Sequence, residues 1–431
     1  MPDPAADRPT VPLSRDIIGG LTTFVTMAYI VVVNPAILST PGTGMPFSGA
    51  LTATVVVAGA MTLFMGLYAK LPFGVAPGMG LNAFFTYTIV LQAGVPWPVA
   101  LGIVFWAGVL FLVVSATPLR EAIALAIPPS LRSATAAGIG LLLTFIGLQA
   151  AGFVADDPAT LVGVGPLDHR ALLTLVGILV IARLGRRDNP LAYLASIFVV
   201  TAAAWAGGWV EPPDRWVSAP DFSSVFLQLD ARAALTWALA PAIVTVMLTD
   251  LFDSLSTFVG VSQAAGLHDA TGRPLRLRQG LIVDAFATLG AGLAGSSPGT
   301  AYVESIAGIR MGGRTGRSAV VTALCFVPCL FVAPAAAAVP PYATAAVLIM
   351  VGVAMFRSVA DVPFERLEVG LPAFATLVLI PLTFSITQGI LWGFILYVAL
   401  HALAGRRAEI GATLWLLAIV SAGLLVLEHA I

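Results

Sequence analysis

Three acidic residues lie inside otherwise apolar sequence, where their chemistry would be functional: Asp250, Asp253 and Glu304. Glu304 closely follows the Pro298-Gly299 pair. A carboxylate at bilayer depth costs at least ~2.5 kcal/mol on insertion scales, so such residues usually face a cavity and mark a pathway. A Pro-Gly pair breaks a helix, and a broken helix is tolerated at that depth only around a cavity or inside protein. The pattern therefore predicts a membrane carrier whose substrate meets Asp250 and Glu304.

Proton coupling is the second chemistry that these acids predict. Asp250 and Asp253 are three residues apart, so both should project toward a similar face of one helix. Two close carboxylates cannot both ionise cheaply, so at least one should hold a proton in some state. We therefore predict that Asp253, Asp250 and Glu304 carry the proton. The alternative is that the acids cap helices or bridge to each other, and for Asp253 a role without substrate contact is equally compatible.

Polar and aromatic residues beside the two helix breaks are further candidates for binding. Asn82 offers both donors and an acceptor, which suits the edge of an amide-like heterocycle. Phe84 is placed to stack on a planar ligand, although a Phe in a membrane helix more often packs in the core or faces lipid. Thr300 and Ser305 are hydroxyl residues beside the second break, where packing against a close backbone is an equal alternative.

Other chemistry is not indicated by the sequence. Asp284 follows an apolar triplet, and we interpret it first as a structural hydrogen-bond anchor. The histidines fall at loops or ends, so no relay or metal cluster is predicted, and no phosphate-binding loop, dinucleotide fingerprint or zincin helix occurs. We therefore expect no metal, no cofactor and no enzyme activity. Cys325 and Cys329 lie one turn apart in an apolar segment and are interpreted as unpaired core residues.

The composition sets the class of protein that must position these residues. Of 431 residues 58% are hydrophobic and 10% charged, and the mean hydropathy is +0.97. Soluble domains are about 25% charged. Apolar windows of spanning length recur along the chain, which predicts an all-α polytopic membrane protein rather than a β-barrel. The net charge of −1 gives no indication of a nucleic-acid partner.

About 14 transmembrane segments are expected, and two are interrupted. Segment 3 is broken at Pro77-Gly78 and segment 10 at Pro298-Gly299. The remaining segments are predicted near 16–38, 50–68, 97–117, 133–154, 171–184, 191–209, 235–262, 279–294, 318–338, 342–355, 371–385 and 389–403. Residues 119–127 are too short to span and should lie at the interface. The run 410–427 is either a further span or a C-terminal packing helix.

The distribution of charge predicts the orientation of the chain in the membrane, and the two helix breaks predict that its two halves are related by an inverted repeat. Basic loops follow the even-numbered segments and acidic loops the others, which places the N-terminus in the cytoplasm. The breaks lie seven segments apart, and this odd offset gives the two halves opposite topology, as in carriers with sites at discontinuous helices. We expect residence in the bacterial inner membrane.

At these residues the chain resembles the AzgA-like hypoxanthine/guanine/adenine permeases of the nucleobase–cation symporter-2 (xanthine/uracil permease) superfamily. The resemblance covers nearly the whole chain. The stretches that carry it are 19–24, 27–29, 34–35, the run Ala-Pro-Gly-Met-Gly-Leu-Asn-Ala-Phe-Phe at 76–85, 250–253, 302–305, 312–316 and 381–389. The second break reads Ser-Ser-Pro-Gly-Thr-Ala where many relatives are threonine-rich, a departure that bears on base preference.

The resemblance implies two seven-helix inverted repeats forming a core and a gate domain, with short β-strands in segments 3 and 10. The expected division is a cytoplasmic tail at 1–15, core at 16–118 and 211–338, and gate at 119–210 and 339–431. It also implies proton-driven purine uptake, with Asn82, Asp250 and Glu304 binding the base and Asp253 needed for transport. Dimerisation through the gate domain is expected.

The residues and the resemblance agree on the substrate class. Carboxylates and an Asn accept N–H donors of a neutral ring, whereas an anion site would use Arg or open helix N-termini. This argues against a sulfate- or bicarbonate-type carrier. A pyrimidine (uracil) or xanthine symporter stays open, as does a passive channel, although channels usually show repeated filters. Neither the preferred purine nor the choice between H⁺ and Na⁺ follows from sequence.

Overall fold

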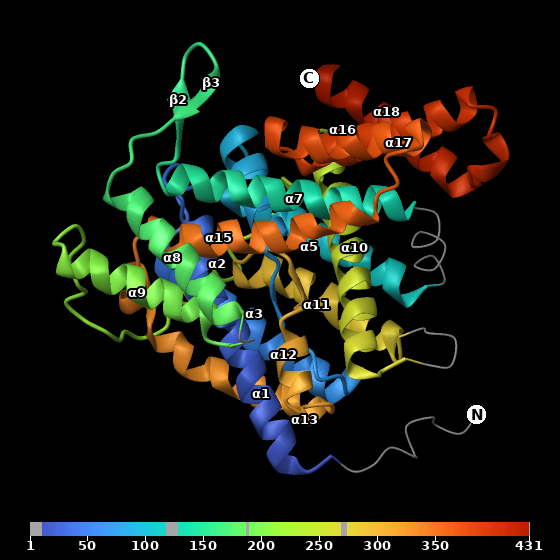
Figure 1. The fold of residues 1–431 in the computed structure, drawn as a ribbon. Helices are drawn as coiled ribbons and strands as arrows, with labels where there is room; N and C mark the ends of the chain where they lie inside the picture. The colour runs from blue at the N-terminus through green and yellow to red at the C-terminus, as the bar shows by residue number, and fades with distance from the viewer. Residues whose placement is uncertain (1–10, 118–127, 187–188, 269–273, 431) are drawn as a thin grey trace.

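The computed structural model describes residues 11–117, 128–186, 189–268 and 274–430, and it is built almost entirely of helices (Figure 1). The elements up to residue 210 are α1 (Leu13–Met27), α2 (Ile30–Leu38), α3 (Phe47–Phe64), η1 (Met65–Ala69), β1 (Val75–Pro77), α4 (Met79–Ala83), η2 (Phe84–Gln92), α5 (Trp97–Ala116), α7 (Pro129–Ala150), β2 (Val154–Asp157), β3 (Leu161–Val164), α8 (His169–Gly185) and α9 (Ala192–Ala206). The later ones are α10 (Ala240–Ala265), α11 (Leu277–Ala294), β4 (Gly299–Ala301), α12 (Ser305–Arg310), α13 (Gly316–Phe326), η3 (Val327–Phe331), α14 (Ala333–Ala337), α15 (Pro341–Phe356), η4 (Arg357–Asp361), α16 (Leu367–Thr383), α17 (Ile386–Leu403), η5 (Arg407–Glu409) and α18 (Ala412–Ala430).

The helices form two bundles, and each bundle takes helices from both halves of the chain. In the first, α1 packs against α12 and α13, α3 against α11 and α13, and α5 against α10 and α11. In the second, α7 packs against α15 and α16, and α8 packs against α9 and α15. Figure 1 shows α7 and α15 running side by side. The polytopic, inverted-repeat fold is therefore confirmed, while the core and gate boundaries stay predictions.

A pair of short strands joins the two halves inside the first bundle. The Pro-Gly pairs predicted breaks in these helices, because Pro has no N–H to donate and cannot continue a helix, and the family resemblance implied that the breaks contain strands. β1 and β4 are antiparallel, with Val75 opposite Ala301, Ala76 opposite Thr300 and Pro77 opposite Gly299. All six residues are buried. The prediction of β-strands in segments 3 and 10 is thus confirmed.

Side chains complete the hydrogen bonding of β1, as buried backbone groups require. The Thr62 hydroxyl of α3 both accepts from the Val75 N–H and donates to the Val75 carbonyl, each at 2.9 Å. The Tyr302 hydroxyl donates to the Pro77 carbonyl. Without these partners the broken helix would leave polar backbone groups unpaired in an apolar bundle, at a cost of several kcal/mol each.

Glycines allow the closest helix contacts in the first bundle. A Cβ built on Gly19 of α1 would lie 2.5 Å from the Gly313 Cα and 2.8 Å from the Gly308 carbonyl oxygen. No side chain larger than hydrogen fits at these distances. Because backbone meets backbone here, α1 and the segment from α12 to α13 are held as one packed unit.

The two bundles also touch through polar contacts between η2 and the end of α16. The Thr88 hydroxyl donates to the Phe384 carbonyl, and the Gln92 amide donates to the Thr383 carbonyl at 2.9 Å. Phe384 has φ of 51°, a left-handed conformation that a non-glycine residue rarely adopts. Its ring lies 5.4 Å from that of Phe145 and 6.4 Å from that of Tyr87.

Some predicted boundaries differ from the structure. The segment expected at 318–338 is not one helix: α13 ends at Phe326, and η3 and the short α14 follow, because Pro328 and Pro334 cannot donate to the helical ladder. Cys325 and Cys329 are free and half-buried. The acidic loop after α7 contains the hairpin β2–β3, which the sequence reading did not anticipate. The interfacial segment predicted at 119–127 lies outside the described residues.

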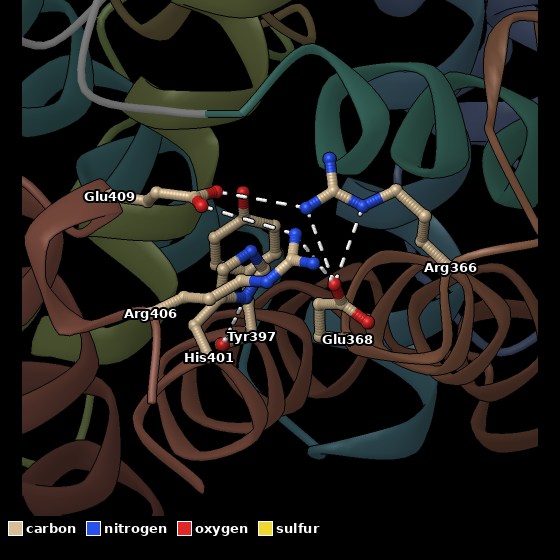
Figure 2. A network of polar contacts seen from close by, with 6 residues as sticks. All are labelled: Arg366, Glu368, Tyr397, His401, Arg406 and Glu409. Carbon is tan, nitrogen blue, oxygen red and sulfur yellow. Dashed lines mark hydrogen bonds and ion pairs between the residues drawn. The ribbon is translucent and has the colours of Figure 1, made fainter. Parts of the chain in front are cut away.

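The C-terminal run forms the helix α18, which packs on α17; whether it spans stays a prediction. Figure 2 shows the charged network that precedes it. Glu368 in the first turn of α16 contacts Arg366 at 3.2 Å and Arg406 at 3.0 Å, and Glu409 completes the network. Exposed ion pairs contribute little each, about 0–1 kcal/mol, so this network orients the chain between α17 and α18 more than it stabilises the fold.

Candidate functional site

The two acids of α10 face different neighbours. Asp250 is 0% exposed and accepts a hydrogen bond from the Thr288 hydroxyl of α11. Its Oδ1 has no partner within the described residues. Asp253 is half-buried, and Glu304 is the charged neighbour of its carboxylate. Asp253 is a charged neighbour of Glu304 and also of Asp250 and Asp284, while Asp250 is linked through Thr288 to the α11 side of β4.

Glu304 lies where the first bundle meets α9 of the second. It stands three residues after β4, at the start of α12, and is half-buried. Its Oε1 accepts a hydrogen bond from the Tyr29 hydroxyl at 2.7 Å. The Tyr29 ring contacts that of Tyr193 in α9, with centroids 5.1 Å apart. Glu304 is therefore held in a fixed orientation at the junction between the bundles.

Asn82 is held by a buried polar network whose centre is Asn34. The Asn82 Nδ2 donates to Asn34 Oδ1 at 3.0 Å, and the Ser297 hydroxyl donates to the same oxygen at 3.1 Å. The Asn34 amide nitrogen donates to Thr54 and Ser296. Asn82 is 0% exposed, and its Oδ1 has no partner among the described residues. The network therefore fixes the amide and leaves one acceptor available.

The other predicted site residues pack beside the strand pair. Thr300 is 2% exposed, and its hydroxyl lies 3.2 Å from that of Ser254. The Ser305 hydroxyl accepts from the Gly74 N–H at 3.0 Å. Phe84 is 1% exposed in the hydrophobic core. These contacts hold the breaks together, and direct contact of the three residues with a ligand stays a prediction.

Asp284 is the anchor that the sequence predicted, and it acts on β4. It is 0% exposed, and its Oδ2 accepts from the Ala301 N–H at 3.2 Å. The Thr288 hydroxyl, one turn along α11, also lies 3.1 Å from the Gly299 carbonyl. Both residues of α11 thus contact the strand that precedes Glu304.

The arrangement favours a neutral ligand that carries N–H groups. Within the described residues, no ion pair joins Asp250, Asp253 or Glu304 to an arginine, lysine or histidine. Carboxylates and the Asn82 carbonyl are acceptors, so they suit N–H donors of a flat ring and would repel an anion. The same residues contain no group of three or more His, Cys, Asp or Glu side chains that would hold a metal ion.

Next to Asp253, α10 packs closely against the second bundle. A cavity of only about 10 Å³ separates Phe252 from α7, α16 and α17, and it is lined by Leu131, Arg132, Thr135, Thr376, Ile390 and Phe394. A purine ring needs far more room than this. None of the three acids lines this cavity, so it is not the site where the base would bind.

Sequence reasoning missed several residues that position the candidate site. Tyr29 and Asn34 were noted only as part of motifs, and Thr288 was not noted. Each is a single polar residue in an apolar helix, which resembles ordinary packing. The available signal was their depth in the segment, because an isolated polar side chain at that depth usually has a specific partner.

Comparison with known proteins gives consistent results. A family model described as "Permease family" matches residues 14–392. The adenine permease AdeP of Escherichia coli is 40% identical over 406 residues, covering 94% of this chain and 91% of that protein. The guanine/hypoxanthine permease PbuO of Bacillus subtilis is 37% identical over 407 residues, covering 92% and 94%.

Among solved structures, the transmembrane domain of the cyanobacterial bicarbonate transporter BicA superposes with a TM-score of 0.66. It is 20% identical and covers 88% of this chain and 97% of that one. At this identity the likeness concerns the fold alone.

Proposed function

The chain belongs to this permease family and is a multi-pass membrane transporter, and from that premise we propose that it imports purine nucleobases by symport with protons. Relatives named for adenine and for guanine/hypoxanthine support the purine class. The single observation that carries the proposal is the pair of half-buried carboxylates, Asp253 and Glu304, at the junction of the bundles without a cationic partner in the described residues.

In this proposal the base donates ring N–H groups to Glu304 and to Asp253, and its edge reaches the Asn82 carbonyl. The Tyr29 hydroxyl orients the Glu304 carboxylate toward the base. Direct contact of Asp250 with the base is part of the sequence prediction, but its position on the α11 side of β4 favours a role in proton coupling. Phe84, Thr300 and Ser305 border the site on the side of the β1–β4 strand pair.

Transport proceeds by alternating access, with one bundle moving against the other. The first bundle is the core domain and the second the gate domain, divided as the sequence predicts. The N-terminus is cytoplasmic, the membrane is the inner membrane, and two copies pair through the gate. The contacts of Thr88 and Gln92 with the end of α16 join the two bundles, so in this proposal they break and form again as the bundles move.

Uptake into proteoliposomes tests the proposal. With tritiated hypoxanthine or adenine outside, an inwardly directed proton gradient should drive accumulation above the external concentration, and an ionophore that collapses the gradient should abolish it. Equilibration without accumulation would instead identify a passive channel. Competition by unlabelled adenine, guanine, hypoxanthine, xanthine and uracil ranks the bases, and preferential competition by uracil would contradict the purine assignment.

The site itself is tested by Glu304→Gln, which keeps the size of the side chain but removes its charge. A hydrogen bond to a charged group contributes about 1.5–3 kcal/mol, so base affinity should fall at least about tenfold. Glu365→Gln is the matched control, because this exposed acid lies in the segment before α16. Near-normal affinity in Glu304→Gln would remove Glu304 from the proposed site.

A further inference from the structure

A cavity of about 410 Å³ lies where the ends of several helices meet. Its walls come from the end of α7, the start of α8, the loop after α9, the end of α14 and the start of α15. They are formed by alanine, valine and proline side chains and by Trp209, together with three residues that carry polar groups, His169, Arg170 and Tyr342. Sites for small molecules are typically cavities of about 300–1,000 Å³ with mostly apolar walls and a few polar groups. The size and lining of this cavity therefore suit a small molecule.

The cavity and Glu304 lie near opposite ends of α9. Tyr193, the second residue of α9, contacts the Tyr29 ring, and the Tyr29 hydroxyl donates to Glu304. Trp209, which lines the cavity, lies just after the last residue of α9. The 15 residues of α9 span about 22 Å at about 1.5 Å per residue. Binding in the cavity is therefore separate from binding at Glu304.

Tyr342 brings a hydrogen-bond donor to the wall of the cavity. Its side chain is only 6% exposed, and its hydroxyl has no partner within the described residues. Its ring meets that of His169, another residue of the wall, edge to face with the centroids 5.9 Å apart. The Thr174 hydroxyl donates to the Tyr342 carbonyl at 3.0 Å and fixes the start of α15 against α8. Buried polar groups normally have a partner, and an acceptor on a ligand would be one for this hydroxyl.

Two stacked rings give the cavity a flat aromatic wall. The rings of His169 and Trp209 are nearly parallel, with an angle of 14° between their planes and centroids 4.7 Å apart. Trp209 is also exposed, so its indole is not enclosed by other side chains. Aromatic rings favour offset stacking on one another, and every nucleobase has a face that can stack in this way. The wall therefore favours a flat ligand.

The charge around the cavity favours a neutral ligand over an anion. Arg170 is the arginine of the wall, and its guanidinium lies 3.8 Å from the Asp168 carboxylate, which offsets its charge. The loops that adjoin the cavity contain more acids than arginines: Asp156, Asp157, Asp168, Glu211 and Asp214 against Arg170 and Arg215. A phosphate group would therefore gain little here. These acidic loops are also the ones that the charge distribution predicts to lie on the side opposite the cytoplasm.

We propose that this cavity is a second binding site, for a flat neutral heterocycle with a hydrogen-bond acceptor, the chemical class to which a purine base belongs. The inference rests on the proposed function. The ring of the ligand stacks on the pair His169 and Trp209, and a ring nitrogen or carbonyl oxygen accepts from the Tyr342 hydroxyl. No carboxylate lines the cavity, and hydrogen bonds between neutral groups are weaker than those to charged groups. The cavity therefore binds the base less tightly than Glu304 does.

Equilibrium binding of tritiated hypoxanthine to the purified full-length protein tests the cavity. Wild-type protein should bind two bases per chain, one tightly and one weakly. Glu304→Gln should weaken the tight component, whereas Trp209→Ala and Tyr342→Phe should weaken only the other. Loss of stacking in Trp209→Ala should lower the weaker affinity at least about fivefold. Loss of one neutral hydrogen bond in Tyr342→Phe, which keeps the ring, should lower it about two- to tenfold.

Trp237→Ala is the matched control, because Trp237 is an exposed indole in the loop before α10 and does not line the cavity. This variant should keep both components. A wild-type protein that binds a single base, or a weak component that neither Trp209→Ala nor Tyr342→Phe changes, would overturn the inference while the tight component leaves the proposed function standing.

Nanodiscs of defined lipid composition separate a heterocycle from a lipid headgroup, without any variant. The weak component should be the same in phosphatidylcholine and in phosphatidylglycerol, because the surroundings of the cavity are not basic. Its loss in phosphatidylglycerol alone would assign the cavity to an anionic headgroup and overturn the inference.

If the wild-type protein binds no purine at all, the proposed function fails. Calorimetry with benzimidazole, another flat neutral heterocycle, then decides the chemistry of the cavity separately. Binding that is weakened in Tyr342→Phe and kept in Trp237→Ala would support the assigned class of ligand, and absence of such binding would overturn it.

Discussion

Removing the Tyr29 hydroxyl by Tyr29→Phe isolates one contact of the candidate site. The ring is 1% exposed and fits the same space, so the change deletes only the 2.7 Å bond to Glu304 Oε1. A hydrogen bond to a charged group contributes about 1.5–3 kcal/mol. At about 1.4 kcal/mol per tenfold, base affinity should fall between about tenfold and a hundredfold, because Glu304 is no longer held toward the base.

Calorimetric binding of hypoxanthine or adenine to the purified protein measures this loss. Tyr68→Phe is the matched control, since Tyr68 is 45% exposed and its ring stacks on Phe64; it should bind the base as the wild type does. A double-mutant cycle with Glu304→Gln then tests the cause. If Tyr29 acts through Glu304, its substitution should have little further effect in the Glu304→Gln background. Fully additive losses would refute the reasoning.

Two further predictions concern stability. Gly19→Ala forces a Cβ to within 2.5 Å of the Gly313 Cα, so overpacking should cost about 1–3 kcal/mol and lower the midpoint of thermal unfolding. Gly185→Ala is the control, because the space around Gly185 is open, and it should not lower the midpoint. Equal midpoints for the two variants would contradict the close approach. Asp221 lies in the loop before α10, and hydrogen bonds from Ser224 and other serine hydroxyls lower its pKa to about 2. The small stabilisation from the ionised Asp221 should be complete above about pH 4 and lost as the pH falls toward 2. Melting curves of Asp221→Asn should therefore lack this part of the fall in melting temperature at acidic pH. If the melting temperature of the variant ran parallel to that of the wild type at every pH, the prediction would be contradicted.

The sequence predicted the fold well because membrane spans and helix breaks have strong local causes. Long apolar windows require helices, and Pro77-Gly78 and Pro298-Gly299 predicted where two of them break. The strands within those breaks were implied by the family resemblance and not by the residues alone. It predicted helix ends less well where several prolines follow one another, as at Pro328 and Pro334, because each can end a helix, kink it or start the next turn.

The site was predicted as a set of residue types but not as a geometry. Spacing of three along α10 suggests one face for Asp250 and Asp253, yet each side chain follows its nearest partner, which for Asp250 is Thr288. Thr288 belongs to another helix, so periodicity within α10 carries no information about it. Asp284 was predicted as an anchor, but its target, the Ala301 N–H, depends on the register of β4.

The strand pair also has a consequence for synthesis of the chain. Val75 precedes its partner Ala301 by 226 residues, which at roughly 5–20 residues per second corresponds to about 10–45 s of translation. During that interval the first break resides in the bilayer without the second. Thr62, only 13 residues earlier, already occupies both polar groups of Val75, so it protects the nascent first half until the second half arrives.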